Sequence, residues 1–153
     1  MQELLNEAKR LASEGVKELV LVAQETTLYG KDLTGEKQLP LLLHELCKIE
    51  GIEWIRLLYC YPEEITDELI KVIKTEEKVC NYIDMPIQHS ENRILQRMGR
   101  RTSREDLVAV IKKLRKEIPD ITIRTTLITG FPGESQEDHE GLMNFVEECQ
   151  FDR

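Results

Sequence analysis

Apolar positions along the chain follow two alternating patterns. Four short apolar runs are typical of buried β-strands, and they lie at residues 17–23, 54–60, 81–87 and 121–128. Around these runs, apolar side chains recur at three- and four-residue spacings, which predicts amphipathic helices at residues 2–13, 38–48, 63–75, 103–117 and 136–149. Two of the helices begin with the Ser-x-x-Asp spacing of a capping box, at Ser103 and at Ser135.

The alternation of strands and helices predicts the fold class. Each predicted strand is followed by a helix, so we expect an α/β protein whose strands form a parallel sheet. The pattern is a helix followed by about four βα units, whereas a closed barrel of such units needs about eight. Because open parallel edges are normally covered, we expect residues 1–153 to be a portion of a larger partial TIM barrel.

Composition and charge narrow the class of protein further. Hydrophobic residues make up 41% and charged residues 33% of the chain, an ordinary balance for a globular domain. The N-terminus is an amphipathic helix rather than a signal peptide, and no long apolar run is present, so we expect a cytoplasmic location without membrane contact. The net charge of −8 argues against binding nucleic acid by phosphate neutralisation alone.

The cysteines give no sign of a metal centre within the chain. There are four, widely spaced and without a C-x-x-C pair: Cys47, Cys60, Cys80 and Cys149. This spacing contains no zinc or iron–sulfur signature. We interpret them as reduced thiols of a cytosolic protein.

The residues just after each apolar run are the candidates for chemistry, because sites of parallel α/β folds lie at the carboxyl ends of the strands. Gln24 and Glu25 follow the first run, Tyr61 and Pro62 the second, and Gln88 and His89 the third. A glycine-rich turn containing Gly130 follows the fourth run. Glycines allow backbone to approach a ligand closely. No phosphate-binding P-loop motif is present.

Strand alternation places Asp84 and Arg124 together on the inner side of adjacent strands. A buried charge needs a partner, so the two side chains either pair with each other or line a site for a zwitterionic ligand. The two interpretations are compatible, and both remain open.

Other polar residues are weaker candidates. His44 and His139 fall in helical segments and are expected to be structural or exposed to solvent. A basic segment behind the third strand forms either a solvated helix face or a clamp for an acidic group or an RNA backbone, and its members are Arg93, Arg97, Arg100 and Arg101.

Two strand-end motifs resemble a known family. The segment Pro86-Ile-Gln-His89, with Ile94-Leu95, Met98 and Arg101 behind it, resembles the P-x-Q-[HS]…L-x-x-M-x-R signature of radical S-adenosylmethionine methylthiotransferases. Gly130-Phe-Pro-Gly-Glu134, followed by Ser135, is similar to the G-F-P-G-E-[ST] turn of that family. The resemblance covers essentially the whole chain.

The motif variants favour one branch of this family. Gln24-Glu-Thr-Thr27, Leu57-Leu-Tyr-Cys-Tyr-Pro62 and Arg124-Thr-Thr126 resemble the branch that modifies an aspartate of a small-subunit ribosomal protein. The tRNA-modifying branch, with its P-x-Q-S-G and S-T-D motifs, is the first alternative. A non-catalytic α/β domain that binds a ligand or partner is the second.

The resemblance implies cofactors and roles. It implies S-adenosylmethionine and a [4Fe–4S] cluster in the parent protein, with Gln24 and Glu25 near the cofactor amino group. Gln88 and Arg124 would contact the ribose and carboxylate, and the turn around Gly130 would line the adenine.

The resemblance also implies what lies outside the chain. The family's C-x-x-x-C-x-x-C cluster ligands are absent, so we expect residues 1–153 to be a truncated radical domain that is inactive alone. The implied partner is a small-subunit ribosomal protein, with RNA contacts made only by further domains. The oligomeric state is left open.

Overall fold

The computed structural model describes residues 1–153 and contains every strand and long helix that the sequence predicts. The strands are β1 (Glu18–Leu21), β2 (Trp54–Leu57), β3 (Tyr82–Asp84) and β4 (Thr122–Arg124). The longer helices are α1 (Gln2–Ser13), α3 (Leu39–Cys47), α4 (Asp67–Thr75), α6 (Arg104–Glu117) and α7 (Gln136–Cys149). The shorter ones are α2 (Lys31–Thr34), α5 (Asn92–Arg97) and the 3-10 helices η1 (Thr26–Leu28) and η2 (Pro62–Glu64).

The boundaries differ from the predicted ones in a few places. All four strands are shorter than the apolar runs that predict them. The helix predicted from residue 63 begins at Asp67 instead, because η2 precedes it and the Thr66 hydroxyl caps it by accepting from Leu69 N–H. Both predicted capping boxes, at Ser103 and Ser135, are present with their reciprocal hydrogen bonds.

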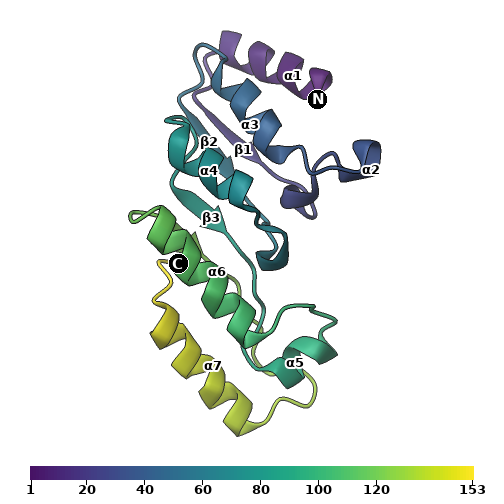
Figure 1. Cartoon of the computed structure of the whole chain (residues 1–153), viewed down its shortest axis with the longest axis vertical. Helices are drawn as coiled ribbons and strands as arrows, with labels where there is room; N and C mark the ends of the chain where they lie inside the picture. Colours follow the sequence, from purple (N-terminus) through teal and green to yellow (C-terminus); the bar gives the residue numbers. More distant parts are fainter.

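The strands are parallel and lie side by side in chain order. β1 pairs with β2, and β3 pairs with β4. The two pairs are joined at Ile55, whose N–H donates to Lys78 C=O at 2.7 Å and whose C=O accepts from Cys80 N–H at 2.9 Å. Figure 1 shows the helices following the same order, from α1 at one end of the molecule through α3, α4 and α6 to α7 at the other.

Alternate strand residues divide between a buried and an open face. Ile55, Ile83 and Ile123 are fully buried in the apolar core. Apolar side chains of the helices pack against this face of the sheet and complete the core. Val20 and Trp54, on the other face of β1 and β2, are about half exposed. This division follows the two-residue period of a strand and leaves the inner face of the sheet open.

The last residues of the chain lie beside β4 and form backbone hydrogen bonds with its neighbourhood. Asp152 N–H donates to Ile123 C=O at 3.0 Å, and Thr125 N–H donates to Arg153 C=O at 2.9 Å. β1 pairs with a strand on one side only. An arc of four parallel strands in chain order agrees with the predicted portion of a barrel.

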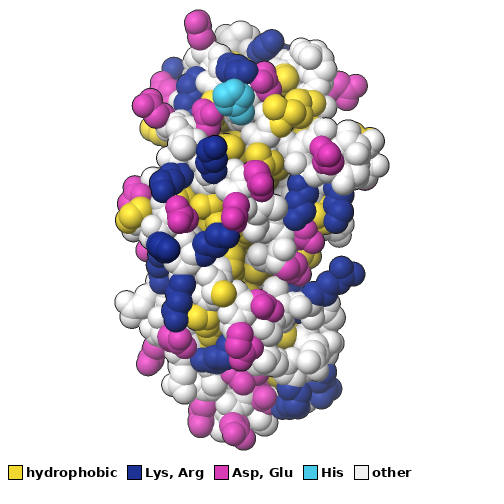
Figure 2. Space-filling model, in the orientation of Figure 1, with side chains coloured by type: hydrophobic (Ala, Val, Ile, Leu, Met, Phe, Trp, Pro, Cys, Tyr) yellow, Lys and Arg dark blue, Asp and Glu magenta, His cyan; other side chains and the backbone are white.

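Charges of both signs are distributed over the surface. Figure 2 shows Lys and Arg side chains interspersed with Asp and Glu across the face displayed, without a continuous basic region. No helix combines the length and the hydropathy needed to cross a lipid bilayer.

Candidate functional site

Hydrogen bonds connect the carboxyl ends of the four strands into one network. Thr26 N–H, just after β1, donates to Tyr59 C=O, just after β2, at 3.0 Å. Tyr59 N–H donates to Asp84 Oδ2 at 3.0 Å, and Arg124 Nη1 donates to Asp84 Oδ1 at 2.9 Å. The carboxyl ends of the four strands therefore lie together at one edge of the sheet.

Asp84 and Arg124 pair with each other, which is one of the two interpretations that the sequence allows. The Asp84 side chain is fully buried, and both of its oxygens accept hydrogen bonds. The Arg124 side chain is 42% exposed, so part of its guanidinium remains available at the open face. A buried carboxylate is tolerated only when it is paired and hydrogen-bonded, and the Tyr59 N–H and Arg124 meet that need together.

Glu25 is hydrogen-bonded through one oxygen only. Its Oε1 accepts from Thr27 N–H at 3.0 Å, from Tyr61 N–H at 3.3 Å and from the Thr27 hydroxyl. Its Oε2 is buried and has no hydrogen-bond partner in the chain. Burial raises the pKa of Glu25 by desolvating the charged form, while the hydrogen bonds from Thr27 and Tyr61 oppose the shift. Gln24, next to it, is exposed and its side chain lies outside this network.

Gln88 adopts a backbone conformation that is rare for a side chain of its kind. Its φ is 72°, and a hydrogen bond of 2.9 Å from His89 N–H to Ile87 C=O closes a three-residue γ-turn around it. γ-Turns with positive φ are uncommon and strained. Gly130 also has a φ of 72°, where a glycine is needed, and open space lies where its side chain would be.

The basic segment behind β3 holds the site loops in place. Arg93 donates to Gly133 C=O at 3.1 Å and pairs with Asp138, while Arg100 donates to Pro86 C=O at 3.0 Å. The Arg100 guanidinium also stacks on the Tyr61 ring at 4.4 Å. Arg93 and Arg100 therefore both anchor backbone turns, and Arg93 remains 52% exposed on α5, as expected for a solvated helix face.

Tyr59 and Cys60 lie beside the candidate site, although the sequence places them only within the motif at residues 57–62 and does not mark them as site candidates. Tyr59 has a φ of 57°, and its side chain is 46% exposed at the open face. The Cys60 thiol is fully buried beside the site, and burial, followed by the charges of Glu25 and Asp84, raises its pKa. The motif gives no sign of the backbone conformation of Tyr59, because that conformation depends on Asp84, which is 25 residues away in the chain.

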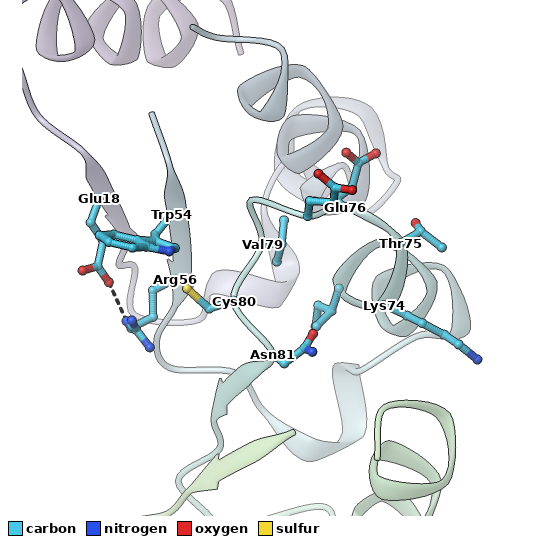
Figure 3. Close-up of a pocket in the computed structure, with 11 residues that line it drawn as sticks. Glu18, Trp54, Arg56, Lys74, Thr75, Glu76, Val79, Cys80 and Asn81 are labelled. Carbon is cyan, nitrogen blue, oxygen red and sulfur yellow. Dashed lines mark hydrogen bonds and ion pairs between the residues drawn. The ribbon is translucent and has the colours of Figure 1, made fainter. Parts of the chain in front are cut away.

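A pocket of about 550 Å³ lies at the opposite, amino-terminal ends of β1 to β3. Figure 3 shows the ion pair of Glu18 and Arg56, 2.6 Å long, on its strand side, with Lys74 and Thr75 at the end of α4 on the other side. The pocket contains none of the predicted site residues. No group of His, Cys, Asp and Glu side chains anywhere in the structure is arranged to hold a metal ion.

Comparison with known proteins identifies the class. The family model described as the Radical SAM superfamily matches residues 1–146. The solved structure of a radical S-adenosylmethionine methyltransferase, TsrM from Kitasatospora setae, superposes on 98% of this chain and 29% of that chain, with a TM-score of 0.74 at 16% identity. The chain therefore belongs to the radical SAM superfamily, and the predicted α/β partial barrel is confirmed.

Relatives of high sequence identity are methylthiotransferases. The chain is 64% identical over 153 residues to "Ribosomal protein uS12 methylthiotransferase RimO" of Lachnoclostridium phytofermentans, spanning all of this chain and 35% of that protein. The proteins of the same name from Alkaliphilus oremlandii and Clostridium perfringens are 56% and 57% identical, and the match covers 35% and 34% of them. The resemblance inferred from the motifs is confirmed, and the chain spans about a third of the length of these relatives.

The left-handed conformation of Tyr59 leads to a stability prediction. A β-branched side chain is strained at a φ of 57°, whereas asparagine tolerates it, so we expect Tyr59→Val to unfold more easily than Tyr59→Asn by about 1–2 kcal/mol. Both variants lose the aromatic ring, so the difference isolates the backbone. Urea denaturation at neutral pH measures it, and equal stabilities would contradict the strain.

The raised pKa of Glu25 leads to a prediction about pH. Because the fold favours the neutral carboxyl, its contribution to stability is fully present below the ordinary pKa of 4.5 and is lost as the pH rises through the folded pKa. We expect Glu25→Gln to increase the free energy of unfolding at pH 7 relative to the unmodified chain, with the gain shrinking below pH 4.5.

Urea unfolding of both chains across this pH range provides the measurement. Glu77→Gln removes an exposed carboxylate without a hydrogen-bond partner and serves as the matched control, which should change stability little at either pH. A Glu25→Gln variant that is less stable at pH 7 than at acid pH, relative to the unmodified chain, would reverse the predicted sign.

Proposed function

We propose that this chain is the S-adenosylmethionine-binding part of a methylthiotransferase that modifies an aspartate of ribosomal protein uS12. The observation that carries the proposal is the gathering of Glu25, Gln88, Arg124 and Gly130 at the carboxyl edge of one parallel sheet. Identities of 56–64% over the whole chain to proteins named as uS12 methylthiotransferases support the choice of substrate.

The residues of this edge fit S-adenosylmethionine. The buried and unpartnered Oε2 of Glu25 offers a hydrogen-bond acceptor for an ammonium group, and the exposed part of the Arg124 guanidinium offers donors for a carboxylate. The Gln88 amide is assigned to the ribose, and the open backbone at Gly130 is assigned to the adenine. When bound, the cofactor supplies the radical chemistry that an unactivated carbon requires.

The residues of this chain do not fit a [4Fe–4S] cluster. The four free cysteines are dispersed, two of them are buried, and none belongs to a group that could hold a metal. We therefore assign cluster binding, and any contact with RNA, to parts of a longer protein. The substrate places the activity in the cytoplasm, where ribosomal proteins are assembled and used.

An assay of the longer protein tests this function. Reconstituted with iron and sulfide, it is expected to transfer a methylthio group to recombinant uS12, detected by mass spectrometry, and to leave tRNA unmodified. Modification of tRNA instead would indicate that the protein belongs to the tRNA-modifying branch of the family. Turnover by residues 1–153 alone would refute the assignment of the cluster to the longer protein.

The assigned role of Arg124 predicts a loss of affinity. A hydrogen bond to a charged group contributes about 1.5–3 kcal/mol, so Arg124→Ala in the longer protein should weaken S-adenosylmethionine binding roughly tenfold or more. Arg56→Ala is the matched control, because Arg56 also pairs with a carboxylate but lies at the other end of the strands.

Equilibrium dialysis measures both affinities, and urea unfolding shows whether each variant is folded. A loss well below tenfold for Arg124→Ala, or an equal loss for Arg56→Ala, would reject the contact.

A further inference from the structure

His89 is a buried residue whose imidazole is only half satisfied. Its side chain is 0% exposed, and Nδ1 accepts a hydrogen bond from Glu91 N–H at 3.0 Å. Because Nδ1 acts as an acceptor, the neutral ring carries its proton on Nε2. That Nε2 is buried without a hydrogen-bond partner, which is an unusual position for a polar group inside a protein.

The unsatisfied Nε2 faces the turn that carries Gly130. It lies 3.6 Å from Glu134 Oε1, somewhat longer than a hydrogen bond, and the Glu134 side chain is only 4% exposed. The other oxygen, Oε2, accepts from Phe131 N–H at 2.9 Å within the same turn. A small approach of the turn toward β3 would complete the contact between His89 and Glu134.

On its other side, His89 adjoins the strained γ-turn at Gln88. The His89 N–H closes that turn, and the Gln88 N–H and C=O are bound to Thr126 at 3.0 Å and Ile128 at 2.7 Å. Strained conformations persist only where the surroundings hold them, and they concentrate at functional sites. His89 therefore lies between the strained γ-turn at Gln88 and the turn that carries Gly130.

We propose that His89 is a positioning residue that holds the Gln88 γ-turn and the turn at residues 130–134 in register, so that both present one surface to S-adenosylmethionine. The ligand in this statement rests on the proposed function, whereas the holding role rests on the hydrogen bonds of His89 with Ile87 and Glu91 and on the 3.6 Å approach of its Nε2 to Glu134. His89 acts through Gln88 and the turn and has no assigned contact with the ligand.

Two substitutions test the roles of the two ring nitrogens of His89 separately. His89→Asn keeps an acceptor for Glu91 N–H but removes the donor toward Glu134, and it should weaken S-adenosylmethionine binding by the longer protein about tenfold. His89→Gln places an amide donor near the position of Nε2 and should restore affinity to within about threefold. His139→Gln is the control, because His139 lies 3.4 Å from the same carboxylate oxygen but is exposed, and it should leave affinity unchanged.

A double-mutant cycle tests whether His89 acts through Gln88. Gln88→Gly relieves the positive φ and removes the amide, so adding His89→Asn to it should cost no further affinity. Equilibrium dialysis gives the four affinities. Losses that simply add, or a His89→Asn variant that binds normally, would overturn the proposal.

Amide hydrogen exchange provides a readout that does not depend on the cofactor. In residues 1–153, His89→Asn should accelerate exchange at Gln88 and Ile128 by about tenfold relative to the amides of α6, which a general loss of stability would accelerate equally. Uniform acceleration or none would overturn the holding role. If the unmodified longer protein does not bind S-adenosylmethionine, the proposed function fails, and this exchange comparison alone decides for or against His89.

Discussion

The buried carboxylate of Asp84 is the interaction on which the site depends. It joins the end of β3 to the end of β4 through Arg124 and to the end of β2 through the N–H of Tyr59. The Tyr59 C=O in turn accepts a hydrogen bond from Thr26 N–H after β1. All four strand ends are therefore connected, directly or through Tyr59, to this one carboxylate. Removing one partner of a buried pair is far more damaging than replacing the whole pair, because it leaves a buried charge without compensation.

Much of the fold follows from local patterns. The two- and 3.6-residue periods locate every strand and long helix, and the Ser-x-x-Asp spacings locate the starts of α6 and α7. The rule that sites form at the carboxyl ends of parallel strands selects Glu25, Gln88 and Gly130 as candidates, and the structure places them at that edge of the sheet. The strand, helix and capping predictions are confirmed because each depends on residues that are close in the chain.

The remaining features depend on contacts between segments that are distant in the chain, so local sequence patterns do not predict them. Hydrogen bonds with Asp84 and Thr26 fix the backbone of Tyr59 at its positive φ. Hydrogen bonds with Thr126 and Ile128, just after β4, fix that of Gln88. The unpartnered Oε2 of Glu25 results from burial after the chain has folded. Gln24, adjacent to Glu25 and equally plausible by motif, is exposed because the chain turns into η1 at that point.

The backbone bonds of Asp152 and Arg153 along β4 have a consequence for how the sheet assembles. Each strand pairs with the one made just before it, so a chain emerging from the ribosome can add every new strand to an existing edge. No strand has to be inserted between two that are already paired, and the loops to be closed stay short. Growth can therefore proceed in the direction of translation, with the most recent strand serving as the template for the next.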